Sequence, residues 1–330
     1  MVRKTGKKII FLFPGQGSQY PGMGLDLIEA SAEAKKVFDT ASRVLNRDMI
    51  SLIRDSDALK RTDISQITLT VVSLAAAAFL RESLIVPAAC AGFSLGEYSA
   101  LACAGVISME DCFRLVNERG KAMQTAVDNL RHKSGEPPGM AAVIGLSPDQ
   151  VETLVSKWKA EGQKDLFAAN FNSSKQVVIS GSAQALTEAE SRFKEAGARK
   201  VIRLNVAGPF HSALMKEAAQ TFSLALEKIQ FNDPINNLIN DTAIKLFSNV
   251  TGKQVKNSEE AKALALRHIV EPVRWTDEEI SIAELKPDVL LEVGPGNVLQ
   301  GLWMDTRSAV PCCAAGTAQN ILGLKSMEYV

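Results

Sequence analysis

Short, uninterrupted runs of apolar residues mark the clearest elements of this chain. The run Ile9–Phe13 predicts a strand buried on both faces, because strands of a parallel sheet are covered on each side and show no polar alternation. Val289–Val293 has the same character and ends at a glycine-proline-glycine turn, after which a helix is expected near Asn297. A third run, Val86–Ala91, contains fewer strong strand formers. Together these runs predict a mainly parallel sheet.

Segments with apolar residues three and four positions apart predict helices around this sheet. Ser31 is a suitable N-cap for one of them. Ile64–Leu80 is the longest apolar stretch, but polar residues interrupt it and it is shorter than a membrane span, so we expect a buried helix. Further helices are expected over Glu97–Val106, Ser108–Met123 and Ser212–Ile229.

The pattern changes in the middle of the chain. Residues 131–139 are polar and rich in turn formers, and we expect a linker or an exposed loop there. Strands are then expected over Met140–Gly145, Leu166–Phe171, Gln176–Ser180 and Lys200–Leu204, with helices over Ser147–Trp158 and Ala183–Ala196. This strand-helix-strand-strand-helix-strand order is the ferredoxin-like arrangement. We therefore expect an α/β fold in which a large subdomain (1–133 and 206–330) carries an inserted ferredoxin-like subdomain (134–205).

The composition is that of a soluble enzyme with no charge preference. The 37 basic and 37 acidic residues cancel, so net charge indicates neither a nucleic-acid partner nor an anionic membrane. The five cysteines form no recognisable disulfide framework, which favours the cytoplasm. Basic residues precede Ile9–Phe13 as in a signal peptide, but the apolar run is too short for one.

The pentapeptide Gly92-Phe93-Ser94-Leu95-Gly96 is the strongest chemical signal. It follows an apolar run and precedes a helical pattern, which is the setting of a nucleophile elbow. The flanking glycines suit a strained turn, and the free N–H groups at the start of the next helix suit a developing oxyanion. Ser94 is therefore the candidate nucleophile.

A serine nucleophile needs a general base, and the chain has only three histidines. His132 lies in the polar segment, where a solvated surface role is expected. His268 lies in a helical pattern and is compatible with a core or supporting role. His211 lies where the chain returns from the small subdomain, and loops at such junctions are common places for catalytic groups. Position thus favours His211 and leaves His268 as the alternative.

Five motifs occur together and in order, and they carry a family resemblance. They are Phe13-Pro14-Gly15-Gln16-Gly17-Ser18-Gln19, Gly92–Glu97, Arg119–Gln124, Pro209-Phe210-His211-Ser212 and Glu292–Gly296. The chain resembles the malonyl-CoA:acyl carrier protein transacylases, the acyltransferase family of fatty-acid and polyketide synthesis, from about residue 8 to about residue 320. The resemblance implies a hydrolase-like α/β subdomain, a ferredoxin-like subdomain, and an active site in the cleft between them.

Carried over by position, the resemblance assigns catalytic roles to individual residues. Ser94 is the nucleophile and His211 its base, with the imidazole held by a backbone carbonyl instead of a buried aspartate. The backbone N–H groups of Gln16 and Leu95 are implied to form the oxyanion hole. His268 stands where the family usually has glutamine or asparagine, and we assign it a supporting role on the substrate side of the site.

The resemblance also suggests how the acyl group is selected. Arg119 is implied to bind the free carboxylate of malonyl, for which a planar, permanently charged guanidinium is a two-point partner; taken alone, an arginine near a helix end is more often a surface ion-pair partner. Phe210 resembles the malonyl-type pattern, since a bulky ring leaves less room for an α-methyl branch. Phe93 stands where many members have histidine, which puts the shape and polarity of the acyl pocket in question.

The implied reaction moves a malonyl group from coenzyme A to the phosphopantetheine thiol of acyl carrier protein through a malonyl-serine intermediate, supplying fatty-acid synthesis. No cofactor is implied, malonyl-CoA being the substrate, and we expect a monomer that binds neither nucleic acid nor membrane. The alternatives are a discrete acyltransferase of a polyketide pathway, a serine thioesterase or esterase, and a catalytically silent docking scaffold. A dinucleotide site at Gly15-x-Gly17 is not expected, because Tyr20 stands where that fingerprint needs glycine.

Overall fold

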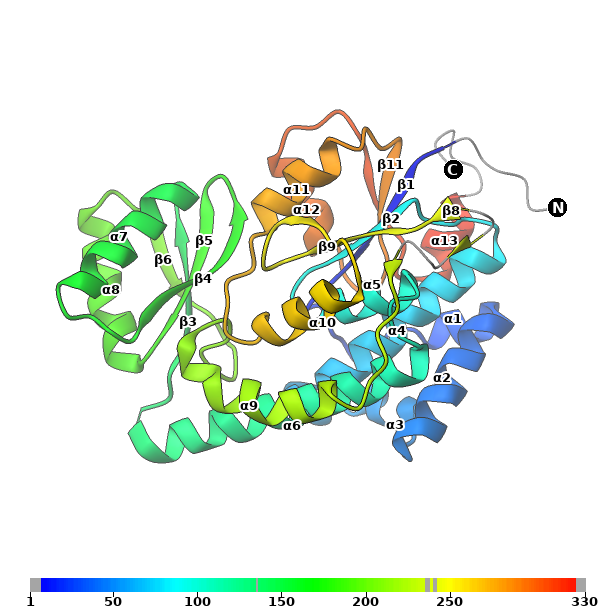
Figure 1. Ribbon diagram of the computed structural model, residues 1–330, viewed down its shortest axis with the longest axis horizontal. Coiled ribbons are helices and arrows are strands. Elements are labelled where there is room, and N and C mark those ends of the chain that lie inside the picture. Colours follow the sequence, from blue (N-terminus) through cyan, green and yellow to red (C-terminus); the bar gives the residue numbers. More distant parts are fainter. Residues whose placement is uncertain (1–6, 135, 235–237, 240–241, 325–330) are drawn as a thin grey trace.

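Two sheets divide the chain into a larger and a smaller part, which lie side by side in Figure 1. The structure is a computed structural model that describes residues 7–134, 136–234, 238–239 and 242–324. The larger part is built on a six-stranded sheet and the smaller part on a four-stranded one. The long helix α6 (Met109–Ser134) runs beneath both and leads directly into the smaller part.

The six-stranded sheet has the order β10-β9-β2-β1-β11-β12. Its strands are β1 (Ile9–Phe13), β2 (Ala89–Gly92), β9 (Lys245–Ser248), β10 (Lys253–Gln254), β11 (Val289–Glu292) and β12 (Cys312–Ala314). All neighbouring pairs are parallel except β10 with β9. The mainly parallel sheet predicted from the apolar runs is thus confirmed, with β1 at its centre.

Both faces of the central strand are buried, as its unbroken apolar sequence predicts. Ile9, Phe11 and Phe13 belong to the large hydrophobic core on one face. Ile10 and Leu12 belong to a second cluster on the other face, which includes Trp275 and Trp303. The helices of the larger part are α1 (Leu25–Ala30), α2 (Ala32–Leu45), α3 (Met49–Arg54), α4 (Thr62–Glu82), α5 (Gly96–Cys103), α6, α9 (Lys216–Leu226), α10 (Ser258–Arg267), α11 (Trp275–Ala283), α12 (Val298–Asp305) and α13 (Ala318–Leu324). Short 3₁₀ turns, η1 (Ala58–Lys60) and η2 (Ala213–Met215), and a two-stranded hairpin, β7 (Leu238–Ile239) with β8 (Thr242–Ala243), complete it.

Helix α4 is a core helix. It is the one helix of the described residues that is long and apolar enough to cross a membrane by length and composition, but 94% of its most apolar window is buried inside the protein. Its contacts with α2 and α6 supply that burial. The buried helix predicted over Ile64–Leu80 is therefore confirmed.

The smaller part is an antiparallel sheet of order β4-β5-β3-β6, with its own hydrophobic cluster. Its elements in chain order are β3 (Gly139–Ile144), α7 (Pro148–Ala160), β4 (Leu166–Ser173), β5 (Gln176–Gly181), α8 (Ala183–Glu195) and β6 (Lys200–Arg203). This is the strand-helix-strand-strand-helix-strand order predicted from the sequence. All six elements lie inside the range 134–205, and the subdomain boundaries themselves stay a prediction.

Three sequence-based expectations need correction. Residues 131–134 continue α6 instead of forming a linker, because the helix extends to Ser134. The helix expected over Ser212–Ile229 is shorter: a 3₁₀ turn comes first and α9 spans only Lys216–Leu226. His268 is not inside a helix but caps the C-terminus of α10. In each case a helix was correctly expected, and the position of its end was misplaced.

Candidate active site

The turn between β2 and α5 holds Ser94 in a strained backbone conformation. Its φ of 51° lies in the left-handed region, which side-chain-bearing residues seldom adopt. The turn needs glycine on both sides: a Cβ on Gly92 would lie 2.1 Å from the carbonyl carbon of Gly96, and one on Gly96 would lie 2.0 Å from the carbonyl oxygen of Phe13. The elbow predicted from the pentapeptide is therefore formed, and it presents Ser94 at the carboxyl edge of the parallel strands.

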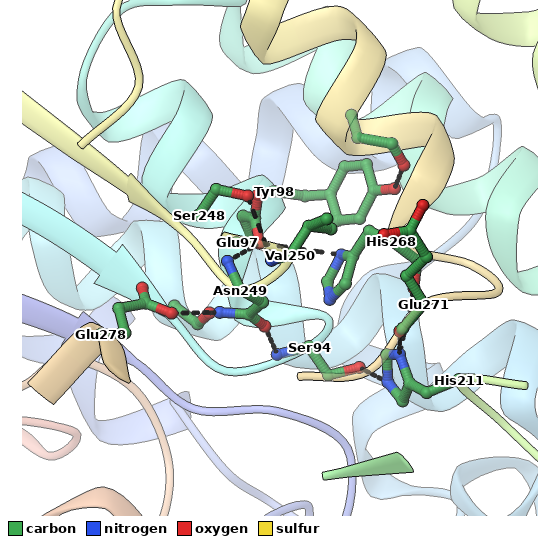
Figure 2. Close-up of polar contacts among 12 residues, drawn as sticks. Ser94, Glu97, Tyr98, His211, Ser248, Asn249, Val250, His268, Glu271 and Glu278 are labelled. Carbon is green, nitrogen blue, oxygen red and sulfur yellow. Dashed lines mark hydrogen bonds and ion pairs between the residues drawn. The ribbon is translucent and has the colours of Figure 1, made fainter. Parts of the chain in front are cut away.

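Ser94 and His211 form a hydrogen-bonded pair (Figure 2). The Ser94 Oγ lies 2.8 Å from His211 Nε2. His211 Nδ1 lies 3.0 Å from the carbonyl oxygen of His268 and 3.2 Å from that of Glu271. Carbonyl oxygens only accept, so Nδ1 carries the proton and Nε2 is left as the acceptor for the serine hydroxyl. The geometry thus selects the tautomer that a general base requires, through backbone carbonyls.

Burial keeps the His211 imidazole neutral. Only 4% of the residue is exposed. Loss of solvation, with a smaller contribution from the Arg119 cation, lowers the pKa of His211 from its ordinary value of 6.5 to about 4. A neutral imidazole can accept the Ser94 proton throughout the neutral pH range.

Two backbone N–H groups beside Ser94 are open. Among the hydrogen bonds of the described residues, those of Gln16 and Leu95 have no acceptor within the chain. Leu95 is the N-cap of α5, where unsatisfied N–H groups and the helix dipole favour negative charge. The Gln16 loop approaches the elbow closely, since a Cβ on Gly15 would lie 2.6 Å from the Phe93 carbonyl oxygen. This arrangement is compatible with the predicted oxyanion hole.

Arg119 is a buried cation with unused hydrogen-bond donors. It comes from α6 and is 1% exposed. Its Nη1 donates to the Gln66 side-chain oxygen at 2.7 Å, and its guanidinium lies 5.3 Å from the centre of the Tyr98 ring. Nε and Nη2 have no partner in the described protein. Because a buried, unpaired guanidinium is costly, the open edge is suited to an anionic ligand.

One cavity of about 590 Å³ contains the nucleophile, the base and the arginine. It is lined from the larger part by Gln16, Ser94, Arg119 and His211, among others. The smaller part contributes Met140, Asn170, Asn172 and Val178. The site therefore lies where the two parts of the chain meet, and Phe210 and Phe93 are also among its lining residues.

Comparisons with known proteins agree with this arrangement. The family described as the acyl transferase domain matches residues 10–324. The chain belongs to the acyl transferase domain family. It is 37% identical to the malonyl CoA-acyl carrier protein transacylase of Bacillus subtilis strain 168 over 297 residues, covering 89% of each chain. It is 39% identical to the Escherichia coli K12 protein of the same name over 298 residues, covering 88% of this chain and 90% of that one.

Solved structures give the same result. An acyl carrier protein S-malonyltransferase from Vibrio cholerae is 35% identical, with a TM-score of 0.86 over 96% of this chain and 99% of that one. A malonyl-transacylase solved in complex with its type II polyketide synthase acyl carrier protein is also 35% identical, with a TM-score of 0.84 over 96% and 98% of the two chains. The predicted family and fold are thus confirmed.

Within this family member, His268 acts on the site differently from the expectation. Its side chain is fully buried, and it is not among the residues that line the cavity. Its backbone carbonyl accepts a hydrogen bond from His211, and its ring lies beside the His211 ring, with the two centroids 5.2 Å apart. Burial lowers the pKa of His268 well below its usual value, so the ring is neutral, and its Nδ1 lies 3.8 Å from Glu97 Oε2. The hydrogen bond that orients His211 therefore comes from the main chain of His268, and the side chain of His268 lies beside His211 and outside the lining of the cavity.

Asn249 is the residue at this site that sequence reasoning missed. It follows β9 and is fully buried. Its Oδ1 accepts a hydrogen bond from the Ser94 N–H at 2.6 Å, and Figure 2 shows its amide between the elbow and Glu278. The only signal was the group of apolar residues Ile244, Leu246 and Phe247 shortly before it, which is compatible with a strand that ends near Asn249.

The position of the acid limb in the pH profile tests the state of His211. We expect kcat/KM for acylation of Ser94 to fall to half at a pH of about 4, and not near 6.5, because burial and Arg119 disfavour the imidazolium in the free enzyme. From about one pH unit above that midpoint through neutral pH, the rate should stay level. Stopped-flow acylation, with far-UV circular dichroism at each pH to verify folding, measures this.

His268→Ala is the matched control, because alanine keeps the backbone carbonyl that holds His211. That variant should retain the same limb with a small loss of rate, whereas His211→Ala should slow acylation by about 10²–10⁴-fold. A wild-type midpoint near 6.5, or a larger loss in His268→Ala than in His211→Ala, would contradict the assignment.

Proposed function

We propose that this chain transfers a malonyl group from coenzyme A to the phosphopantetheine thiol of an acyl carrier protein through a malonyl ester on Ser94. The observation that carries the proposal is the shared cavity: an activated serine and a buried guanidinium with open donors face the same space. Relatives named malonyl CoA-acyl carrier protein transacylase support it.

In the first half-reaction, His211 Nε2 takes the hydroxyl proton as Ser94 Oγ attacks the thioester carbonyl. The carbonyl oxygen becomes an oxyanion, which the N–H groups of Gln16 and Leu95 stabilise; each such donor typically contributes about 3 kcal/mol. The carbon–sulfur bond then breaks, and the departing thiolate of coenzyme A takes the proton from His211. The products are free coenzyme A and malonyl-Ser94.

In the second half-reaction, the carrier-protein thiol gives its proton to His211 and attacks the ester. Collapse of the second tetrahedral intermediate breaks the bond to Ser94 Oγ, which recovers its proton from His211. Thioester and ester exchange in this cycle without net oxidation, and the proton carried by His211 is the only one moved within the protein.

We assign the preference for a malonyl group to Arg119. A malonyl carboxylate can occupy the two open donors, Nε and Nη2, while Nη1 stays bonded to Gln66. Phe210, 7% exposed, lines the same cavity and restricts the space for a branched acyl group. The carboxylate thus pairs with a charge that is otherwise buried alone.

The pathway and setting are part of the proposal. We infer that the chain works as a monomer and supplies malonyl units to fatty-acid synthesis. We place it in the cytoplasm, because its five free cysteines suit a reducing compartment. The second candidate function is transfer of malonyl to a carrier protein of a polyketide pathway. It is favoured by 34% identity over 295 residues to a Burkholderia thailandensis polyketide biosynthesis protein, although the match covers only 24% of that protein's length.

Transfer of label tests the reaction. Radiolabelled malonyl-CoA should leave one malonyl group on the wild-type protein, visible by intact mass, and holo acyl carrier protein should remove it as malonyl-carrier protein. Ser94→Ala should take no label. Release of malonate to water in place of transfer would indicate a thioesterase, and a wild-type protein that takes no label would indicate a silent scaffold.

Replacement of Arg119 tests acyl selection. Arg119→Ala should lower kcat/KM for malonyl-CoA by about 10²–10⁴-fold, because removing one partner of a buried ion pair typically costs about 3–5 kcal/mol. Acetyl-CoA has no carboxylate, so its turnover should fall much less. Arg119→Lys should recover only part of the loss, since an ammonium cannot make the planar two-point contact.

Arg114→Ala is the matched control, because Arg114 is on the same helix with an exposed ion pair to Asp111. Its kcat/KM for both thioesters should equal that of wild type. Equal proportional losses for malonyl and acetyl in Arg119→Ala would show that Arg119 is structural and would withdraw the claim of carboxylate selection.

A further inference from the structure

Asn249 occupies a special place relative to the nucleophile. Strands β2 and β9 are parallel neighbours, so their carboxyl ends meet at one edge of the sheet. β2 runs into the elbow and β9 runs into Asn249, which brings the asparagine beside a serine 155 positions earlier in the sequence. Its side chain is fully buried and is not among those lining the acyl cavity, so it acts on the protein and not on the substrate.

The side-chain amide of Asn249 forms hydrogen bonds with the backbone on both sides of the elbow turn. Oδ1 accepts from the Ser94 N–H at 2.6 Å, and Nδ2 donates to the Gly92 carbonyl oxygen at 2.6 Å. These two backbone groups flank Phe93, so one planar side chain spans the strained turn. Left-handed backbone at a non-glycine residue costs on the order of 1–3 kcal/mol and persists only where the surroundings over-determine it. Asn249 supplies such a constraint.

The same contact leaves the oxyanion donors free. The Ser94 N–H, which lies next to the reacting hydroxyl, is committed to Asn249, while the Leu95 N–H has no acceptor within the described chain. A turn that relaxed toward ordinary φ would redirect the Ser94 hydroxyl and the Leu95 N–H together. Holding the turn therefore aligns nucleophile and oxyanion donor in one step.

The backbone of the elbow determines which way the amide of Asn249 faces, and a buried carboxyl group adds a third contact. Nδ2 also donates to Glu278 Oε2, at 2.7 Å, from helix α11. Two acceptors, the Gly92 carbonyl and Glu278, thus lie on one side of the amide and one donor, the Ser94 N–H, lies on the other. Reversing the amide would set its oxygen against the Gly92 carbonyl oxygen and its N–H groups against the Ser94 N–H. Burial raises the pKa of Glu278 well above its usual range, so this group is a neutral acid that accepts at Oε2.

Glu97 completes the arrangement from the other side. It lies in α5, one turn after Ser94, and is 3% exposed. Its Oε2 accepts the backbone N–H of Asn249 at 2.9 Å. The main chain of Asn249 is therefore bonded to the elbow helix and its side chain to the elbow turn (Figure 2).

We propose that Asn249 is a positioning residue for the nucleophile, holding Ser94 in its strained conformation with an amide that bonds the backbone on both sides of the turn and is supported by Glu278. The proposal rests on the proposed function for its substrate but not for the reactivity of Ser94 itself. It makes a specific demand: the side chain at 249 must donate toward Gly92 and Glu278 and accept from Ser94.

Three variants separate the parts of this demand. Asn249→Ala removes all three side-chain hydrogen bonds. Asn249→Asp keeps the acceptor for Ser94 but sets an oxygen against the Gly92 carbonyl, while the neutral Glu278 can donate its O–H to the aspartate. Glu278→Gln keeps an acceptor for the asparagine and should remain close to wild type.

Two rates are measured on each folded variant: the rate of modification of Ser94 by phenylmethylsulfonyl fluoride, and kcat and KM for malonyl transfer. Asn249→Ala and Asn249→Asp should lower the modification rate and kcat by about 10²-fold, the usual effect of a misplacement of about 1 Å, with KM nearly unchanged. Asn257→Ala is the control, since it removes an exposed asparagine that only caps α10 through the Glu260 N–H.

The outcomes decide between positioning and simple structural support. Loss of thermal stability in Asn249→Ala and Asn249→Asp with serine reactivity equal to that of Asn257→Ala would overturn the proposal. Wild-type serine reactivity in a folded Asn249→Asp would overturn the proposal in the same way, and this variant serves if Asn249→Ala fails to fold. A wild-type protein that reacts with the sulfonyl fluoride but accepts no malonyl would overturn the proposed function and leave the positioning test intact.

Discussion

The left-handed turn at Ser94 is the constraint on which the rest of the site depends. A φ of 51° at a serine is unfavourable in isolation, so the surrounding structure has to hold it. Gly92 and Gly96 remove the side chains that would collide there, and Asn249 bonds the backbone on both sides of the turn. Three neighbouring parallel strands, β1, β2 and β9, end at this edge, and the sheet that they form is buried on both faces. The packing of the core therefore holds the backbone on either side of the turn, and the position of the reactive serine depends on it.

Burial then determines the electrostatics of the cavity. His211 is neutral because it is buried near a cation, and backbone carbonyls, not a carboxylate, orient it. A carboxylate partner would raise the pKa of the imidazole, whereas carbonyls fix its tautomer with less effect on its charge. Arg119 keeps two donors unused at the same depth, which leaves a positive charge that a substrate carboxylate can neutralise. The acyl pocket is therefore prepared for an anion before any substrate enters.

The sequence predicted what local pattern and short motifs encode. The unbroken apolar run Ile9–Phe13 predicts a central strand, and the glycines around Ser94 predict the elbow, because both are consequences of neighbouring residues. Asn249 and Glu278 could not be found this way: their roles arise only when β9 pairs with β2 and α11 packs beside them. The same reason explains the role of His268, where position in the chain suggested a side chain and the fold uses its carbonyl oxygen. Two helix ends were misplaced. Helix α6 continues into the polar segment that was expected to be a linker, and α9 begins only after a 3₁₀ turn.

A crystal structure of the wild-type protein, frozen after soaking in malonyl-CoA without carrier protein, tests the central claim most directly. The account predicts a malonyl ester on Ser94 Oγ, with its carboxylate on Nε and Nη2 of Arg119 and its carbonyl oxygen facing the N–H groups of Gln16 and Leu95. The backbone of Ser94 should remain left-handed, with its N–H on Asn249. A malonyl group attached to another residue, or one whose carboxylate points to solvent while Arg119 contacts only Gln66, would contradict the account.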